Sequence, residues 1–278
     1  MTVSVLTIVR NRAGHLAQLV EGLRRSAVQP RELIVVDMGS DPPVHVEGLP
    51  FPSHIIRLSG GGLPLAAARN AAARMATGET LLFLDVDCIA MRGLVGAMAE
   101  ALDAEDALIC AQVRYLGPDA ARGDWQEADL LAHSCGHPAR RFPAAGLRRE
   151  ENAGLFWSLV FGIRRRRYQI LGGFDDAFVG YGAEDTDFGF RAREAGLALL
   201  FMAGPGAFHQ HHDVIEPPLQ HIGDIVRNAR IFHGKWGRWP MEGWLGAFKR
   251  ADLIAWNETS VELLRLPTDR EIAAARIV

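Results

Sequence analysis

The stretch Leu81-Leu82-Phe83-Leu84-Asp85-Val86-Asp87 decides the fold of this 278-residue chain. Residues 81–85 are typical of a buried strand that ends in a carboxylate, and a second carboxylate follows two residues later. In an open α/β sheet, ligands gather outside the carboxyl ends of the strands. Carboxylates are hard oxygen donors that suit Mg²⁺ or Mn²⁺. Asp85 and Asp87 therefore stand where a metal ion and a phosphorylated ligand are expected, although a plain polar turn after a core strand is the alternative.

Strands alternate with helices on both sides of this stretch. Apolar runs predict strands at 3–9, 33–36, 55–58, 107–113, 155–163 and 197–202. Apolar residues at helical spacing, or a run rich in alanine, predict helices over 16–23, 65–76, 94–102, 125–132 and 164–171. Such alternation predicts an α/β fold with a doubly wound, mostly parallel central sheet flanked by helices.

The composition is that of a soluble globular protein, with 49% hydrophobic and 23% charged residues. The net charge of −3 gives no overall attraction to nucleic acid or to acidic membranes. Three cysteines without paired spacing argue against a disulfide framework and favour a reducing compartment. The first residues lack the pattern of a signal peptide, and no apolar run approaches the roughly 18 residues of a membrane span. We expect a cytoplasmic protein, and peripheral attachment to the inner face of the membrane remains open.

Polar residues of the first half fall at the ends of predicted strands. They are Arg10, Arg12, Asp37, Asp85 and Asp87. A nucleotide needs such a set, because an acidic group can bind a base or ribose and arginines can fork onto phosphate oxygens. The triple glycine at 60–62 matches neither a dinucleotide fingerprint nor a P-loop, which argues against a dehydrogenase and a P-loop kinase.

A second group of polar residues lies between Gly172 and Asp187. Phe188 and Arg191 continue it at helical spacing, so Glu184 and Asp185 are expected at a helix N-terminus. There the helix dipole stabilises anions, and simple capping is the plain alternative. Capping needs one acid, however, and several crowd together here behind glycines. A carboxylate at the mouth of a glycine-hinged, mobile loop at 180–183 is a plausible general base.

Three histidines lie within four residues after the predicted strand at 197–202. They could be exposed, or imidazole beyond a strand end could complete a metal site begun by Asp85 and Asp87. We favour His212 or His209 over His211. The Arg69-Asn70 pair within the alanine-rich helix could face the ligand or solvent, and both interpretations stay open.

In this order and spacing, the motifs resemble those of family 2-type glycosyltransferases with a GT-A fold. The style is closest to the β-1,4-galactosyltransferases and the chondroitin-polymerase-like bacterial enzymes. The resemblance covers roughly residues 2–213. It rests on Val9-Arg10-Asn11-Arg12 with Gly14-His15-Leu16, Val35-Val36-Asp37, Ala68-Arg69-Asn70, Phe83-Leu84-Asp85-Val86-Asp87, and Gly172-Gly173-Phe174-Asp175 through Glu184-Asp185.

The resemblance implies a GT-A domain over 1–215, with a nucleotide-binding half of about 1–115 and an acceptor-binding half of about 116–215. Residues 216–278 lie outside the matched motifs, and we expect them to form a helical extension packed on the domain. The implied activity is inverting, metal-dependent transfer of a sugar from a UDP-sugar to a hydroxyl of a saccharide or lipid-linked acceptor. The sugar would be of the galactose, N-acetylgalactosamine or glucose type. A role in surface polysaccharide or glycoconjugate synthesis follows from the resemblance alone.

Residue roles carry over from the matched motifs. The residues implied to bind the donor are Thr7, Val9, Arg10, Arg12, Asp37, Arg69, Asp85, Val86 and Asp87. Those implied to bind the Mn²⁺ or Mg²⁺ ion are Asp87, Asp85, His212 and His209. Those implied to bind the acceptor are Tyr181, Gly182 and Glu184, and Asp185 matches the catalytic base, with Glu184 beside it. Tyr181 stands where a tryptophan is usual and Ala183 where a glycine is usual, and that loop contacts both sugars.

Two other classes of protein keep such a sheet. A non-catalytic nucleotide-sugar-binding module would not need Glu184 and Asp185. A sugar nucleotidyltransferase would carry a glycine-rich N-terminal loop with a lysine, where this chain has Arg10-Asn11-Arg12. Their products differ: a transferase releases UDP and a glycoside, a nucleotidyltransferase releases pyrophosphate, and a binding module releases neither.

Overall fold

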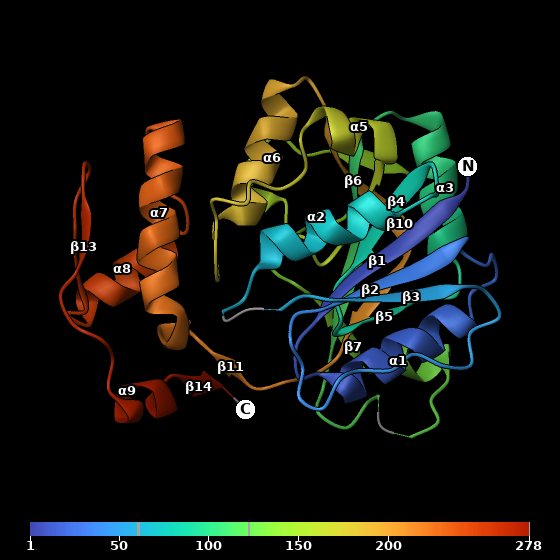
Figure 1. Ribbon diagram of the computed structural model, residues 1–278, viewed down its shortest axis with the longest axis horizontal. Coiled ribbons are helices and arrows are strands. Elements are labelled where there is room, and N and C mark those ends of the chain that lie inside the picture. The colour runs from blue at the N-terminus through green and yellow to red at the C-terminus, as the bar shows by residue number, and fades with distance from the viewer. Residues whose placement is uncertain (60–61, 122, 278) are drawn as a thin grey trace.

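A computed structural model describes residues 1–59, 62–121 and 123–277 of the chain, so Gly60 and Gly61 of the triple glycine lie outside the described residues. Within these ranges the centre is a ten-stranded sheet, whose main path runs β3-β2-β1-β4-β9-β6-β10-β5 (Figure 1). The strands are β1 (Val3–Val9), β2 (Glu32–Asp37), β3 (Ser53–Arg57), β4 (Thr80–Leu84), β5 (Cys88–Ala90), β6 (Leu108–Leu116), β9 (Val160–Arg164) and β10 (Leu199–His209). Two short strands join this path at its side, β7 (Ser134–Gly136) on β6 and β8 (Leu147–Arg149) on β10.

The sheet combines a parallel half with a mixed half. Strands β3, β2, β1 and β4 pair in parallel, as do β6 and β10. Strand β9 runs antiparallel between β4 and β6, and β5 runs antiparallel to β10. The parallel half brings the carboxyl ends of β1, β2 and β4 to one edge of the sheet. This confirms the predicted α/β architecture and places the polar residues that follow these strands at one edge.

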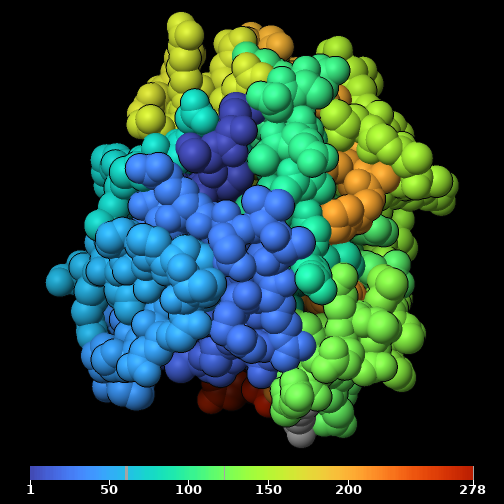
Figure 2. Space-filling view, turned by 90° about the vertical axis from the view of Figure 1, so that its right-hand side faces the viewer, coloured from blue at the N-terminus to red at the C-terminus, as the bar shows by residue number. Residues whose placement is uncertain are grey.

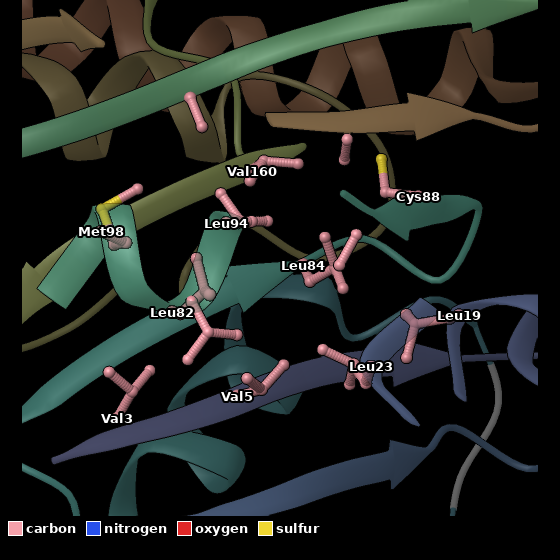
Figure 3. Packing of buried hydrophobic residues seen from close by; sticks show 14 of the residues in the cluster. Val3, Val5, Leu19, Leu23, Leu82, Leu84, Cys88, Leu94, Met98 and Val160 are labelled. Carbon is pink, nitrogen blue, oxygen red and sulfur yellow. The ribbon is translucent and has the colours of Figure 1, made fainter. Parts of the chain in front are cut away.

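Helices cover both faces of the sheet. They are α1 (Ala13–Arg24), α2 (Leu65–Met75), α3 (Leu94–Ala104), α5 (Arg165–Ile170) and α6 (Glu184–Glu194), and a short α4 (Glu127–Ala132) lies beyond the edge near β7. Side chains alternate along β4, so Leu82 and Leu84 join the core under α1 and α3 (Figure 3). Leu81 and Phe83 point the other way, into the core under α2, α5 and α6.

Two predicted strands have different bounds in the structure. The strand expected over 155–163 begins only at Val160, because η1 (Ala153–Leu155) and a turn precede it. That turn carries Ser158, which hydrogen-bonds to the start of α6. The strand expected over 197–202 continues to His209, through a break in register between Met202 and Ala207. The extra length places His209 at the same edge of the sheet as Asp87.

The C-terminal extension is helical, as predicted, and it also contains two small sheets. Its elements are β11 (Val214–Ile215), η2 (Leu219–His221), α7 (Ile222–Trp236), α8 (Glu242–Arg250), β12 (Ile254–Trp256), β13 (Val261–Leu263), α9 (Asp269–Ala274) and β14 (Arg276–Ile277). Strand β11 pairs with β14, and β12 pairs with β13. Much of the extension packs around its own apolar core.

The extension stands on the α6 side of the molecule, with α7 between α6 and the small β12–β13 sheet (Figure 1). The view turned by 90° is filled mainly by blue and green residues of the first half, and the red C-terminal residues show only at its lower margin (Figure 2). Among the described residues, no helix is long and apolar enough to cross a membrane.

Candidate active site

Asp87, His209 and His212 meet at one edge of the sheet. Strand β5 starts directly after Asp87 and pairs with the end of β10, so Cys88 lies opposite His209. His209 Nε2 lies 3.4 Å from Asp87 Oδ1, and His212 Nε2 lies 3.3 Å from Asp87 Oδ2. One ligand atom from each of the three residues falls within 4.8 Å of the others. We call these three residues, together with Arg12, the Asp87 corner.

The charges of the Asp87 corner favour an ionised carboxylate. Arg12 Nη1 lies 2.8 Å from Asp87 Oδ2. Burial alone would raise the pKa of Asp87, but the contacts with His212, His209 and Arg12 hold that pKa well below its usual range. Burial lowers the pKa of His209, which keeps its imidazole neutral. A buried carboxylate with two imidazole nitrogens at this spacing is a donor set that fits a divalent transition-metal ion.

Asp85 lies beside this cluster and outside it. Its Oδ1 accepts a hydrogen bond of 2.9 Å from the amide of Val86. Burial and the charge of Asp87 raise the pKa of Asp85 to about 7, although the Arg69 guanidinium opposes the shift. The two carboxylates of the Asp-x-Asp stretch thus face different partners, since Asp87 faces histidines and Asp85 faces Arg69.

The remaining candidates for donor binding lie along the same edge. Thr7 and Val9 are buried in β1, and Thr7 Oγ1 has no hydrogen-bond partner among the described residues. A small cavity beside Thr7 is also lined by Arg69, Asp85 and Ser158. This cavity has a volume of about 10 Å³, room for about one water molecule.

The loops after β1 and β2 are tied to each other. Asp37 Oδ1 accepts a 2.7 Å hydrogen bond from the amide of Ser40, whose hydroxyl in turn accepts one from the amide of Asn11. Burial would raise the pKa of Asp37, but the hydrogen bonds from Ser40 lower it, so its carboxylate stays charged. Arg10 is half-buried and donates to the carbonyl of Gly62.

Arg69 connects these donor-side residues to the second acidic group. The side chain is buried in α2, and its Nη1 lies 3.2 Å from Glu184 Oε1 and 3.7 Å from Asp185 Oδ1. Its guanidinium also lies over the ring of Phe174, at 5.1 Å. Of the two interpretations left open for Arg69, solvent exposure is wrong, because the side chain is buried among carboxylates, and contact with a ligand stays a prediction.

Asp185 is oriented by Ser158, a residue that the sequence did not single out. Both the amide and the hydroxyl of Ser158 donate to Asp185 Oδ2, at 2.9 and 3.0 Å. The other oxygen, Oδ1, has no hydrogen-bond partner in the described part of the chain. One oxygen of the carboxylate is therefore fixed by Ser158, and the other lies 3.7 Å from Arg69 Nη1 without accepting a hydrogen bond. We call Arg69, Ser158, Glu184 and Asp185 the Asp185 corner.

Glu184 differs from Asp185 in its surroundings. It is the first residue of α6 and is buried. Burial and the charge of Asp185 raise the pKa of Glu184 to about 7, against the opposing pull of Arg69. Near neutral pH this carboxyl group can therefore hold a proton and donate a hydrogen bond to a bound hydroxyl.

The loop at 180–183 was predicted to be mobile, and in the structure its backbone accepts hydrogen bonds from α7. Asn228 is fully buried, and its Nδ2 donates to the carbonyls of Val179, Tyr181 and Gly182. The ring of Tyr181 stacks on that of His221, with centroids 4.6 Å apart. The predicted acceptor residues Tyr181 and Gly182 thus lie where the loop meets the extension.

Sequence reasoning missed the residues that support the Asp185 corner. Ser158 fell within a predicted strand, and Asn228 fell within a segment outside the matched motifs. Only the helical spacing of Asp224, Asn228 and Lys235 could have drawn attention to one face of α7. Nothing in the local sequence states which loop that face meets.

Comparison with protein families decides the class. A model described as glycosyl transferase family 2 matches residues 4–143, half of the chain. The chain belongs to this family. A second model, described as the N-terminal domain of galactosyltransferase, matches residues 140–213. The two matches together span the sheet and both corners of the site.

Two curated proteins resemble parts of this chain. An uncharacterized glycosyltransferase of Bacillus subtilis, YwdF, is 29% identical over 108 residues, covering 38% of this chain and 40% of that protein. A probable N-acetylgalactosaminyltransferase 9 of Caenorhabditis elegans is 24% identical over 211 residues, covering 67% of this chain and 33% of that protein. The chain thus spans well under half the length of either relative.

Solved structures share the fold. TarS of S. aureus, residues 1–349, matches with a TM-score of 0.56 and 17% identity, covering 83% of this chain and 64% of that one. GalNAc-T7 with UDP, GalNAc and Mn²⁺ matches with a TM-score of 0.58 and 17% identity, covering 76% and 44%. These likenesses confirm the GT-A architecture that the sequence predicted.

Proposed function

We propose that this glycosyltransferase transfers a sugar from a UDP-sugar to a hydroxyl of a saccharide or lipid-linked acceptor, with inversion and with a divalent metal ion. The observation that carries the proposal is the meeting of two opposite kinds of site at one edge of the sheet. The Asp87 corner can hold a cation, and the Asp185 corner can accept a proton. Neighbouring structures of the same fold bind UDP or UDP-GlcNAc, which supports the choice of donor.

The Asp87 corner favours Mn²⁺ over Mg²⁺. Asp87, His209 and His212 would hold the ion, and Arg12 stands beside it to meet the diphosphate. Mg²⁺ prefers oxygen ligands, whereas two imidazoles favour a softer ion. When bound, such an ion neutralises charge on the diphosphate of the leaving group. The structure of GalNAc-T7 with Mn²⁺ is consistent with this choice.

The donor would lie along the carboxyl ends of β1, β2 and β4. In this proposal Asp37 would accept a hydrogen bond from the uracil, and Arg10 and Arg12 would bind phosphate oxygens. Asp85, with Thr7, Val9, Val86 and Arg69 around it, lines the floor towards the ribose and the sugar. Apart from Arg69, which comes from α2, these residues lie at or near the ends of β1, β2 and β4, and consecutive parallel strands end at one edge of the sheet.

Asp185 would be the catalytic base. Its Oδ1, which accepts no hydrogen bond and lies 3.7 Å from Arg69 Nη1, would take the proton of the acceptor hydroxyl as the hydroxyl oxygen forms a bond to the anomeric carbon. The bond from the anomeric carbon to the phosphate oxygen breaks at the same time, and its electron pair leaves with UDP. Attack from the face opposite the leaving group inverts the anomeric centre. Ser158 keeps Asp185 aimed, and Glu184 binds the acceptor beside it.

A panel of UDP-sugars tests the proposal. Purified protein is incubated with each donor and a mixture of saccharide acceptors, with Mn²⁺, with Mg²⁺ and with EDTA, and UDP and glycoside are measured. We expect UDP release from one donor, greater with Mn²⁺ than with Mg²⁺ and absent with EDTA. Pyrophosphate as product would point to a nucleotidyltransferase. Tight UDP-sugar binding without any turnover would point to a non-catalytic binding module.

A further inference from the structure

One face of helix α7, the first α-helix of the extension, contacts α6 and the loop before α6. Asp224, Asn228 and Lys235 recur on that face at spacings of four and seven residues. Between them, Phe232 joins an apolar cluster with Phe178 and others below the loop. The opposite face of α7 packs into the core of the extension. Helix α7 is therefore shared between the extension and the site.

Asn228 supplies the central contact of this face. One amide group donates to three successive parts of the loop, at 3.1 Å to Val179, 3.3 Å to Tyr181 and 2.9 Å to Gly182. The side chain is fully buried. The carbonyl of Val179 also accepts from Arg227, so loss of the Asn228 amide removes a donor chiefly from Tyr181 and Gly182, which should weaken the path of the loop.

Asp224 holds the other side of the same loop. Its Oδ2 accepts a hydrogen bond of 3.3 Å from the amide of Tyr181. A Cβ atom added at Gly180 would fall 2.1 Å from Asp224 Oδ2, so the loop lies directly against this carboxylate. Gly180 also has a φ of +80°, a conformation that favours glycine.

The path of this loop fixes the start of α6. Ala183 is the N-cap residue and has a φ of +72°, which is strained for a residue with a side chain. Glu184 and Asp185 follow it directly. One turn further, buried Asp187 receives Lys235 at 2.6 Å and the indole N–H of Trp236 at 3.0 Å. Helix α7 thus forms hydrogen bonds or ion pairs with the chain both before and after Glu184 and Asp185.

We infer that Asn228 is a positioning residue for the transfer reaction, and that the extension orients the carboxylate of Asp185 through the loop at 179–183. This inference rests on the proposed function, because it assigns the purpose of the contact to the base of that reaction. A base displaced by about 1 Å can lose on the order of a hundredfold in rate. The donor side of the site is built by strand ends and does not depend on this contact.

The test compares Asn228→Ala with a matched variant on the same helix, Arg230→Ala. Arg230 also donates to a backbone carbonyl, that of Val261 at 2.8 Å, but within the extension and away from the loop. We measure kcat with saturating acceptor, glycoside formed per UDP released, and the Kd of UDP with Mn²⁺. Asp224→Ala, at a partly exposed position, serves as a second loop variant if Asn228→Ala folds poorly.

We expect Asn228→Ala to lower kcat at least about tenfold and to lower the glycoside formed per UDP, because water then competes with a misplaced acceptor. The Kd of UDP should stay within about twofold, and Asp224→Ala should show a smaller effect of the same kind. Arg230→Ala should change none of these quantities. Wild-type kcat and product ratio in Asn228→Ala would overturn the inference, as would an equal loss in Arg230→Ala.

A second readout keeps this inference separate from the proposed function. If wild-type protein releases no UDP from any donor, the proposed function fails, and amide hydrogen exchange over 179–184 still tests the contact. Faster exchange there in Asn228→Ala than in Arg230→Ala supports the positioning of the loop by α7. Equal exchange in the two variants overturns it.

Discussion

The two corners of the site are held in place by different parts of the molecule. The Asp87 corner consists of residues at or just beyond strand ends, and the pairing of β5 with β10 brings Asp87 and His209 together. The Asp185 corner sits on a helix whose start depends on Ser158, on buried Arg69 and on α7. Residues at strand ends are held by the hydrogen bonds of the sheet. A helix that starts after a strained loop residue, as α6 does after Ala183, must be held by contacts from neighbouring elements.

This difference yields the largest expected effect, because the two corners should fail separately. Asp185→Asn keeps the shape of the side chain, and its amide oxygen can still accept hydrogen bonds from Ser158. The amide cannot take up the proton of the acceptor hydroxyl. We expect transfer to fall by about 10²–10⁴-fold. The Kd of UDP with Mn²⁺, measured by calorimetry, should remain near the wild-type value. Loss of UDP binding in this variant would show that the corners are not separable.

The second effect concerns stability. Arg69→Met removes the cation shared by Asp85, Glu184 and Asp185, and breaking a buried pair costs about 3–5 kcal/mol. For a chain of this size, the thermal midpoint should fall by roughly 6 °C or more. Arg24→Met breaks an exposed pair with Glu21, and should cost less than about 1 kcal/mol. Similar midpoints for the two variants would contradict the role of Arg69.

The smallest effect is a pH dependence to which Glu184 contributes beside Asp85, whose pKa is also raised to about 7. The pKa of Glu184 is raised in the folded state to about 7, so its stabilising contribution is complete at low pH and is lost as the pH rises through about 7. In metal-free buffer, Glu184→Gln should remove part of the fall in thermal midpoint between pH 6 and pH 8, by a few degrees. The exposed Glu105→Gln should leave the profile unchanged. A profile unchanged in Glu184→Gln would contradict this assignment.

The sequence predicted the Asp87 corner more fully than the Asp185 corner, for a physical reason. The position of a short motif at a strand end can be predicted from the sequence, because parallel strands end at one edge of the sheet. Asp85-Val86-Asp87 and the histidines after 197–202 could therefore be joined in advance. The preference for His209 or His212 over His211 agrees with the cluster in the structure, while the metal itself remains a proposal.

The supports of the Asp185 corner could not be predicted in this way. Glu184 and Asp185 stood out as acids at a helix start, but Ser158 was hidden in an apolar run that a strand explained equally well. Asn228 lies more than 40 residues after the loop that it holds. Nothing in its neighbourhood signals a buried amide, because helical spacing gives only the face and never the partner.

The most direct test of the account measures UDP binding by Asp87→Asn with and without Mn²⁺. In the wild-type protein, Mn²⁺ should strengthen UDP binding, and in Asp87→Asn this gain should disappear together with transfer. His209→Ala should lose part of the same gain. If Asp87→Asn binds UDP with Mn²⁺ as tightly as the wild type does, the Asp87 corner does not hold the metal, and the proposed metal-dependent transfer is contradicted.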